Sequence, residues 1–142
     1  MLGRIVATGE DVTGLDAGEL VTAIDLPAED FSANHTYLKL RDRLSYAFAL
    51  VSVAAIVEVS DGRISRADLA FGGVAHKPWR LPEVEDTLRG RSPSPEAFRA
   101  AAERLTAGAV GQGANDFKIE LARRATVRGL EQAAAGTPQS QT

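Results

Sequence analysis

The sequence predicts an α+β fold in which an antiparallel sheet of three to four strands carries three C-terminal helices on one face. Three observations support this class. Segments that alternate between apolar and polar residues occupy the first half of the chain, and an Asp-Gly pair separates two of them. Segments with helical spacing follow. Strands that precede helices around a central hairpin are typical of a sheet covered by helices.

Composition and charge exclude several classes of protein. The 142 residues fit one domain, and 44% hydrophobic with 25% charged residues excludes general disorder. A net charge of -3 lacks the basic field of a nucleic-acid-binding protein. Without cysteine, the chain cannot ligate iron–sulfur clusters through thiolates, and His35 and His76 have no metal-binding spacing.

We expect a cytoplasmic protein that is exported only as cargo of a partner subunit. The longest apolar run, residues 46–57, is too short to span a bilayer, and acidic residues follow the N-terminus too soon for a signal peptide. Residues 1–17 show no clear periodicity and are interpreted as a lead-in. The domain spans residues 18–136, and residues 137–142 are expected to be a disordered tail.

Two short strands are predicted in the first third of the chain. Residues 19–26 alternate in polarity and end at Pro27, which cannot continue a strand. Residues 37–41 alternate again. Their two leucines face one way, and Lys39 and Arg41 face the other.

A long strand and a hairpin are predicted at the centre of the chain. Residues 45–60 have small apolar side chains at odd positions and large apolar ones at the first even positions. This pattern indicates a strand buried on both faces early and on one face later. A helix over residues 46–55 is the competing interpretation, because alanine favours helices. Asp61 and Gly62 favour the strand, since this pair signals a tight hairpin to a returning strand over residues 64–71.

Three helices are predicted in the second half. Pro82 begins the first, which Gly90 ends, and Ser94 caps the second. Glycines in residues 111–113 break the second helix, and Asn115 can cap the third. The side chains expected to face the core are Val84 and Leu88 in the first helix, Phe98, Ala102, Leu105 and Ala109 in the second, and Phe117, Leu121 and Ala125 in the third.

The residues alone indicate no catalytic site, and three features allow two interpretations each. Gly72 and Gly73 form either a turn or a backbone that approaches a ligand. Lys39 is either a solvated edge residue or a contact to an anionic ligand. The basic and aromatic residues 76–80 form an interaction surface, unless Trp79 folds back onto its own core.

Four ordered segments carry a family resemblance. They are GELVTAIDLP (residues 18–27), YLKLRDRLSYAFALVSVAA (residues 37–55), LAFGGVAHKPWR (residues 69–80) and NDFKIELARR (residues 115–124). With them, residues 18–133 resemble the C-terminal domain of the FAD-binding (medium) subunit of molybdenum hydroxylases. That family comprises xanthine dehydrogenases, carbon monoxide dehydrogenases and bacterial aldehyde oxidoreductases. The residues of the four segments are most similar to those of the last group.

The resemblance implies that the chain is the C-terminal part of an FAD-binding subunit that helps to pass electrons from iron–sulfur clusters to FAD. The fold it implies is that of the CO dehydrogenase flavoprotein C-terminal domain. Lys39 matches the family's lysine near the flavin ring, where its charge would stabilise the reduced ring. Val21 or Thr22 matches the apolar contact from the linking strand. The molybdenum cofactor and the [2Fe–2S] clusters belong to partner subunits.

The sequence departs from the family because it lacks the N-terminal half, whose glycine-rich loops hold FAD. We therefore expect the isolated chain to be inactive and not to retain FAD. It is a fragment, a remnant or one half of a split subunit. Its expected partners are the FAD-binding N-terminal half, the iron–sulfur subunit and the molybdenum subunit. We expect it to bind neither nucleic acid nor a membrane. The alternative is a stand-alone, non-catalytic interaction module that uses the loop around Trp79.

Overall fold

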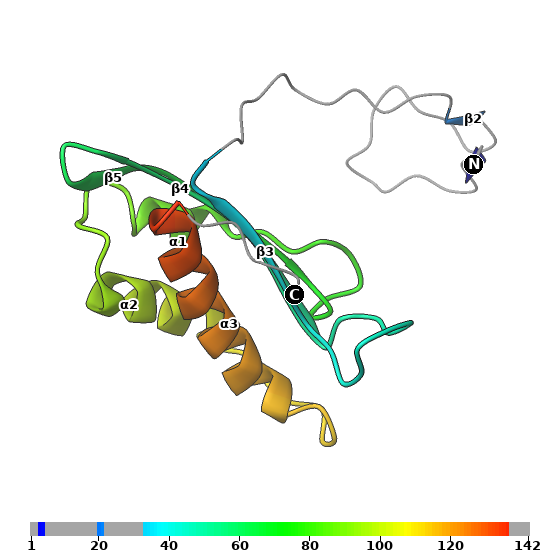
Figure 1. Ribbon diagram of the computed structural model, residues 1–142. Coiled ribbons are helices and arrows are strands. Elements are labelled where there is room, and N and C mark those ends of the chain that lie inside the picture. Colours follow the sequence, from blue (N-terminus) through cyan, green and yellow to red (C-terminus); the bar gives the residue numbers. More distant parts are fainter. Residues whose placement is uncertain (1–2, 5–19, 22–32, 137–142) are drawn as a thin grey trace.

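The computed structural model describes residues 3–4, 20–21 and 33–136 of the chain (Figure 1). Its main body is a three-stranded antiparallel sheet in the order β3-β4-β5, followed by three helices, which confirms the predicted fold class. The elements of this body are β3 (His35–Leu40), β4 (Val51–Ser60), β5 (Arg63–Gly72), α1 (Pro82–Asp86), α2 (Pro95–Thr106) and α3 (Phe117–Ala134).

The N-terminal part contributes a separate pair of very short strands. β1 (Gly3–Arg4) and β2 (Leu20–Val21) pair antiparallel. Of the strand predicted over residues 19–26, only these two residues of β2 are described. The rest of that strand and nearly all of the predicted lead-in lie outside the described residues.

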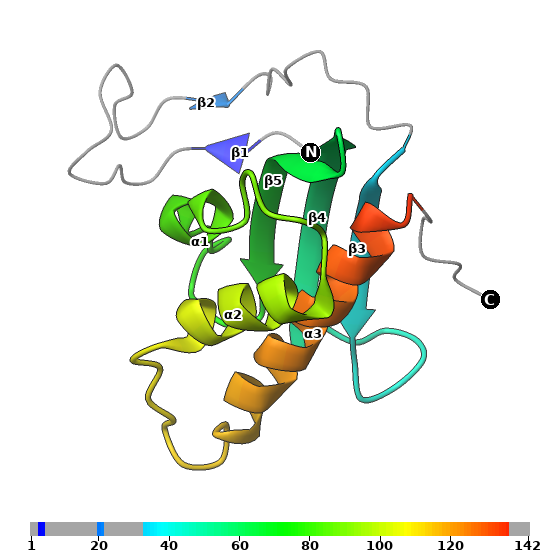
Figure 2. The ribbon, with the colours of Figure 1, turned by 90° about the vertical axis from the view of Figure 1, so that its left-hand side faces the viewer.

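The helices form one layer and the sheet forms the other. Figure 2 shows α2 and α3 lying across the same face of the sheet. Alternate residues of β4, beginning with Val51 and Val53, point into this layer and are buried. At Gly129 of α3, an added Cβ would lie 3.3 Å from Cγ1 of Val53, so the helix backbone packs directly on the central strand. The core therefore lies between the helices and one face of the sheet.

The hairpin between β4 and β5 was predicted correctly. Asp61 and Gly62 both have positive φ, 52° and 73°, as a two-residue type I′ turn requires. The register brings Ser60 opposite Arg63. The returning strand extends one residue beyond the predicted range at each end.

The prediction of one continuous strand over residues 45–60 is wrong. β4 begins only at Val51, which pairs with Leu40 at the end of β3, so the preceding residues have no strand to pair with. They form a loop in which Tyr46 has a φ of 55° and is 99% exposed, and Phe48 is 97% exposed. The competing helix is not formed either. Alternation alone did not reveal where the partner strand ends.

The helix starts were predicted better than the helix ends. Ser94 caps α2 as expected, because its Oγ accepts a hydrogen bond of 3.3 Å from the backbone N–H of Ala97. α1 ends at Asp86, before the predicted Gly90, and α2 ends before Ala109, which is exposed. A turn with the positive-φ Gly108 closes α2, whereas α1 passes into turns over residues 87–90 before the chain reaches Gly90.

The start of α3 differs from the prediction by one residue. Asp116 occupies the N-cap position instead of Asn115, and the Asn115 side chain accepts a hydrogen bond from the backbone N–H of Gln112. Phe117, expected in the core, is 53% exposed because it lies in the first turn of the helix. Ala125 is buried as predicted.

The two outer edges of the sheet differ. The edge of β5 is closed, because Phe71 and Trp79 exchange two backbone hydrogen bonds and the backbone N–H of Leu69 donates to Oε1 of Glu85 at 2.8 Å. Ile64 also accepts from the backbone N–H of Gly90 at 2.8 Å. The outer edge of β3 pairs with no strand in the described part of the chain.

Candidate functional site

The candidate site lies on the sheet face opposite the helices. Leu38 of β3 is buried beneath the helical layer, and the adjacent Lys39 therefore points to the other face, as predicted. Lys39 pairs with Ser52 of β4, and Ser52 pairs with Gly72 of β5. These three residues cross the sheet side by side, and we call them the polar row. No described helix covers them.

Ser52 and Gly72 pack unusually closely within the polar row. A Cβ added at Gly72 would lie 2.6 Å from Oγ of Ser52, a separation that real Cβ atoms do not show. The Ser52 side chain therefore occupies the space that a β5 side chain would need. Ser52 is only 6% exposed, and its hydroxyl makes no hydrogen bond with any of the described residues.

The row next to the polar row is apolar, and two of its three side chains are small. Tyr37 pairs with Ala54, which pairs with Ala70. Both alanines are exposed, and Tyr37 is about half exposed at the β3 edge. The face beside the polar row thus offers a surface of two methyl groups bordered by an aromatic ring.

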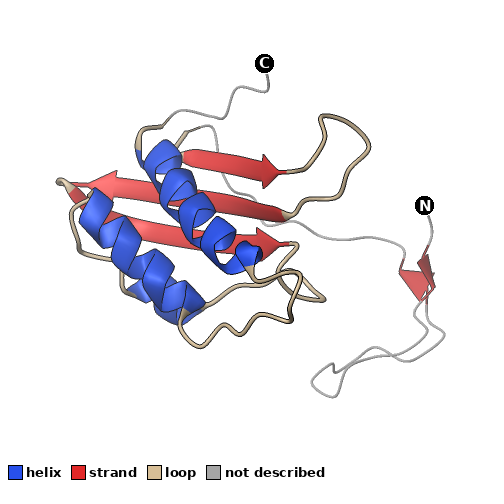
Figure 3. Cartoon of the chain, turned by 90° about the horizontal axis from the view of Figure 1, so that it is seen from below, coloured by secondary structure: helices blue, strands red, loops and turns tan. Residues whose placement is uncertain are grey.

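Two loops border the end of the sheet at which the polar row lies. Figure 3 shows that the loops after β3 and β5 leave the sheet at the same end. They touch at Gly73, where an added Cβ would lie 2.7 Å from the backbone oxygen of Leu50. Gly73 also has a φ of 78°, and Nζ of Lys118 in α3 donates to its carbonyl at 3.1 Å. A glycine is required there on both grounds, which favours the turn interpretation for this residue.

The loop after β3, which we call the aromatic loop (residues 41–50), presents large apolar side chains to solvent. Leu44, Tyr46 and Phe48 are almost fully exposed, and the guanidinium of Arg43 donates a hydrogen bond to the carbonyl of Tyr46. Three such side chains within five residues form an exposed apolar group of the kind that interaction sites carry.

The structure places Trp79 back on the core. Its ring centroid lies 6.0 Å from that of Phe71, and its side chain is half-buried. The adjacent Arg80 forms ion pairs with Glu85 at 2.8 Å and Asp68 at 2.6 Å. The hydrogen bond to Glu85 is the main reason why the pKa of Arg80 is raised. This loop therefore has a structural role, and the exposed apolar surface lies in the aromatic loop instead.

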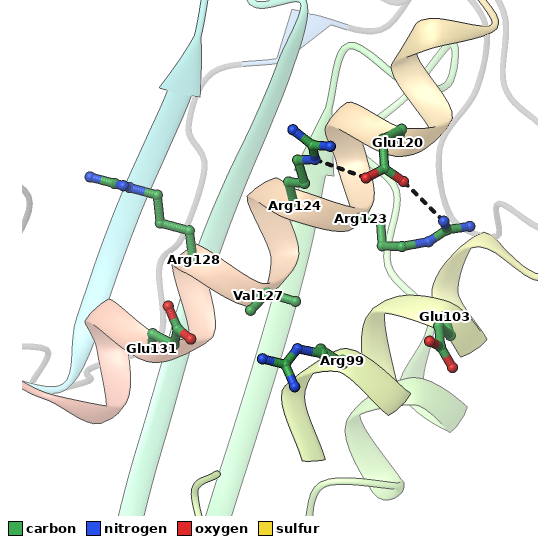
Figure 4. A pocket seen from close by; sticks show the side chains of 8 residues that line it. All are labelled: Arg99, Glu103, Glu120, Arg123, Arg124, Val127, Arg128 and Glu131. Carbon is green, nitrogen blue, oxygen red and sulfur yellow. Dashed lines mark hydrogen bonds and ion pairs between the residues drawn. The ribbon is translucent and has the colours of Figure 1, made fainter. Parts of the chain in front are cut away.

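A groove of about 380 Å³ lies between the exposed sides of α2 and α3 (Figure 4). Its charges largely compensate one another: Glu120 bonds to Arg124 at 2.8 Å and to Arg123 at 2.9 Å. These arginines, chiefly Arg124, lower the pKa of Glu120. The pairing therefore stabilises the fold above the ordinary pKa of glutamate and is lost as the pH falls through the lowered value. The groove lies on the helical layer, away from the polar row.

The two other predicted contacts stay predictions. Val21 lies in β2, where its backbone pairs with Gly3, and Thr22 lies outside the described residues. Within the described ranges, no three histidine, aspartate or glutamate side chains gather into a metal site. No helix of those ranges is long and apolar enough to cross a membrane.

Comparison with known proteins matches residues 35–133 to the family described as CO dehydrogenase flavoprotein C-terminal domain. The chain is 42% identical to the aldehyde oxidoreductase FAD-binding subunit PaoB of Escherichia coli (strain K12), over 87% of this chain and 35% of that protein. It is 34% identical to the nicotine 6-hydroxylase medium subunit of Paenarthrobacter nicotinovorans, over 67% of this chain and 32% of that protein.

A solved structure has the same fold. Reconstituted CO dehydrogenase from Oligotropha carboxidovorans matches with a TM-score of 0.75 at 25% identity, over 94% of this chain and 48% of that one. The chain thus spans about one third of the length of the two curated relatives named above.

Proposed function

Since the chain belongs to the CO dehydrogenase flavoprotein C-terminal domain family, we propose that it acts as the C-terminal part of the FAD-binding subunit of a molybdenum-containing oxidoreductase. In that subunit it helps to pass electrons from iron–sulfur clusters to FAD. The observation that carries this proposal is the family match over residues 35–133, which includes the whole polar row.

The polar row suits a flavin ring. FAD, when bound, supplies a ring that takes up electrons and passes them on. Lys39 offers a cation that makes no ion pair with the described residues, and a cation at short range stabilises negative charge on a neighbouring group. Gly72 and the two alanines beside the row leave the sheet surface low enough for a flat ring. Val21 or Thr22 would add an apolar contact.

The remainder of the subunit must hold most of the cofactor. One lysine and an open sheet face cannot offset the entropy lost when a dinucleotide is immobilised. We therefore assign the pyrophosphate and ribose contacts to an N-terminal FAD-binding half. An iron–sulfur subunit with [2Fe–2S] clusters and a molybdenum subunit would complete the complex, with the cytoplasm as its expected location. The isolated chain should be inactive and free of flavin.

Co-expression tests this role directly. The chain is produced together with the segment of the Escherichia coli relative that precedes the matched third, and the purified product is examined for flavin absorbance. We expect the two polypeptides to purify together with bound flavin. The relative's own C-terminal third, expressed separately in the same way, is the positive control. If that control binds flavin and this chain neither associates nor retains flavin, the proposed role is wrong.

The aromatic loop favours one alternative, a stand-alone interaction module without a flavin. Leu44, Tyr46 and Phe48 would then serve a partner unrelated to oxidoreductases. This alternative predicts a stable, flavin-free chain that does not associate with the flavin-binding segment. The same co-expression experiment therefore separates the two functions.

Replacing Lys39 with alanine in the flavin-loaded complex should make the flavin harder to reduce. Loss of a nearby positive charge is equivalent to about one pKa unit, which corresponds to about 30 mV for a two-electron couple. We expect the reduction potential to fall by about this amount, as measured by redox titration. Lys39→Arg should restore the potential, because it keeps the charge.

A charge-matched control distinguishes a local effect from a change in net charge. Lys77→Ala removes the same charge from an exposed position in the loop after β5 and should leave the potential unchanged. Equal potentials for Lys39→Ala and the wild-type complex would remove Lys39 from the site, with the fold intact in both.

A further inference from the structure

Ser52 is an unexplained polar group on the functional face of the sheet. It lies in the central strand, between Lys39 on β3 and Gly72 on β5, and it is only 6% exposed. Its hydroxyl has no hydrogen-bond partner among the residues that the structure describes. The hydroxyl still reaches solvent, because His35 Nδ1 is the one buried side-chain polar atom without a partner among the described residues. It is therefore available to a ligand on this face.

The absence of a side chain at Gly72 gives the Ser52 hydroxyl its room. The φ of Gly72 is not positive, so the backbone of β5 does not itself demand glycine there. Any larger residue would place a Cβ 2.6 Å from Oγ of Ser52. Glycine therefore leaves room for the hydroxyl beside β5, on the face where Lys39 also points.

The surroundings define the ligand that this hydroxyl can serve. Ala54 and Ala70 form a low apolar surface next to the polar row, and Tyr37 borders it with a half-exposed ring. A cation and a hydroxyl stand together at one side of that surface. This arrangement fits a flat heteroaromatic ring that carries hydrogen-bond acceptors and negative charge on one side.

We propose that the Ser52 hydroxyl donates a hydrogen bond to an acceptor atom of the flavin ring, beside the group that Lys39 faces. This inference rests on the proposed function and adds a second polar contact to the same site. Ser52 would bind and orient the ring, and Lys39 would supply the charge. Gly72 would act as a positioning residue by leaving Ser52 free to reach the ligand.

Ser52→Ala gives two effects of opposite direction, which makes the proposal testable. In the free chain, the variant loses a hydroxyl that bonds to none of the described residues, so its thermal midpoint should equal or exceed that of the wild type. In the complex with the flavin-binding segment, it loses a hydrogen bond to the ring. The Kd for FAD added to the flavin-free complex should then rise about tenfold. A purely structural serine would not separate stability from flavin binding.

Ser60→Ala is the matched control, because Ser60 lies in the same strand and on the same face at the exposed far end. It should leave the Kd unchanged. Gly72→Ala is a second variant that should weaken FAD binding by crowding the Ser52 hydroxyl; if Gly72→Ala does not fold, Ser52→Ala alone decides. Equal Kd values for Ser52→Ala, Ser60→Ala and the wild type would overturn the inference.

The outcome also separates this inference from the proposed function. If the wild-type complex binds no flavin, the proposed function fails before Ser52 is examined. If flavin binds and Lys39→Ala lowers the potential, the proposed function stands, and an unchanged Kd for Ser52→Ala rejects only the role of Ser52.

Discussion

Replacing Glu85 with alanine is expected to lower the free energy of unfolding by about 3 kcal/mol. Glu85 is 1% exposed, and its carboxylate accepts hydrogen bonds of 2.8 Å from the backbone of Leu69 and from two nitrogens of Arg80. The substitution leaves the N–H of Leu69 without an acceptor at the sheet edge. Because Arg80 is half exposed and also pairs with Asp68, water and that carboxylate limit the loss. Urea denaturation measures the change as a lower midpoint at constant m-value.

Two variants separate the buried carboxylate from general effects of substitution in α1. Glu85→Gln keeps an oxygen for Leu69 but loses the charge that Arg80 requires, so an intermediate loss is expected. Asp86→Ala removes the exposed ion pair between the last residue of α1 and Arg89 in the following turn, and should change stability by less than about 0.5 kcal/mol. If Glu85→Ala unfolds at the same urea concentration as Asp86→Ala, the carboxylate does not hold α1 to β5.

Truncating Phe71 to alanine should cost about 3–5 kcal/mol. Its side chain is 2% exposed, and its ring packs against Trp79 at a tilt of 56°. The cavity left behind lies at the closed edge of β5, where Phe71 and Trp79 also exchange backbone hydrogen bonds. Trp79 is the single tryptophan of the chain, so its fluorescence follows both the local packing and global unfolding.

Phe48→Ala is the control for Phe71→Ala, because it removes the same side chain from a position that is 97% exposed. Its free energy of unfolding should stay within about 0.5 kcal/mol of the wild type. Similar losses in the two variants would contradict the assignment of Phe71 to the core and of the aromatic loop to the surface.

The local signals in the sequence predicted the parts of the fold that short-range chemistry sets. Asp61 and Gly62 can take positive φ, and Ser94 can cap a helix, so the hairpin and the start of α2 were predictable. Residues 45–50 were misassigned because strand formation there depends on a partner. β3 ends at Leu40, and nothing near residues 45–50 in the sequence reveals that end.

The candidate site was predictable only in part. Alternation around Lys39 placed its side chain opposite the buried leucines, and the structure confirms this orientation. Ser52 was not singled out, because a serine within an apolar run carries no signal of its own. Its significance follows from the register, which sets it between Lys39 and Gly72. The burial of Glu85 under Arg80 depends on tertiary packing, which a charged residue in the first turn of a helix does not reveal.

The unequal edges of the sheet limit how copies of this chain can associate through their backbones. Trp79, Glu85 and Gly90 occupy the hydrogen-bonding groups along β5, whereas the outer side of β3 pairs with no other strand in the described part of the chain. Two molecules joined β3 to β3 would form a six-stranded sheet with a closed edge at either end. Growth would stop at that pair, so this architecture disfavours propagation into fibrils.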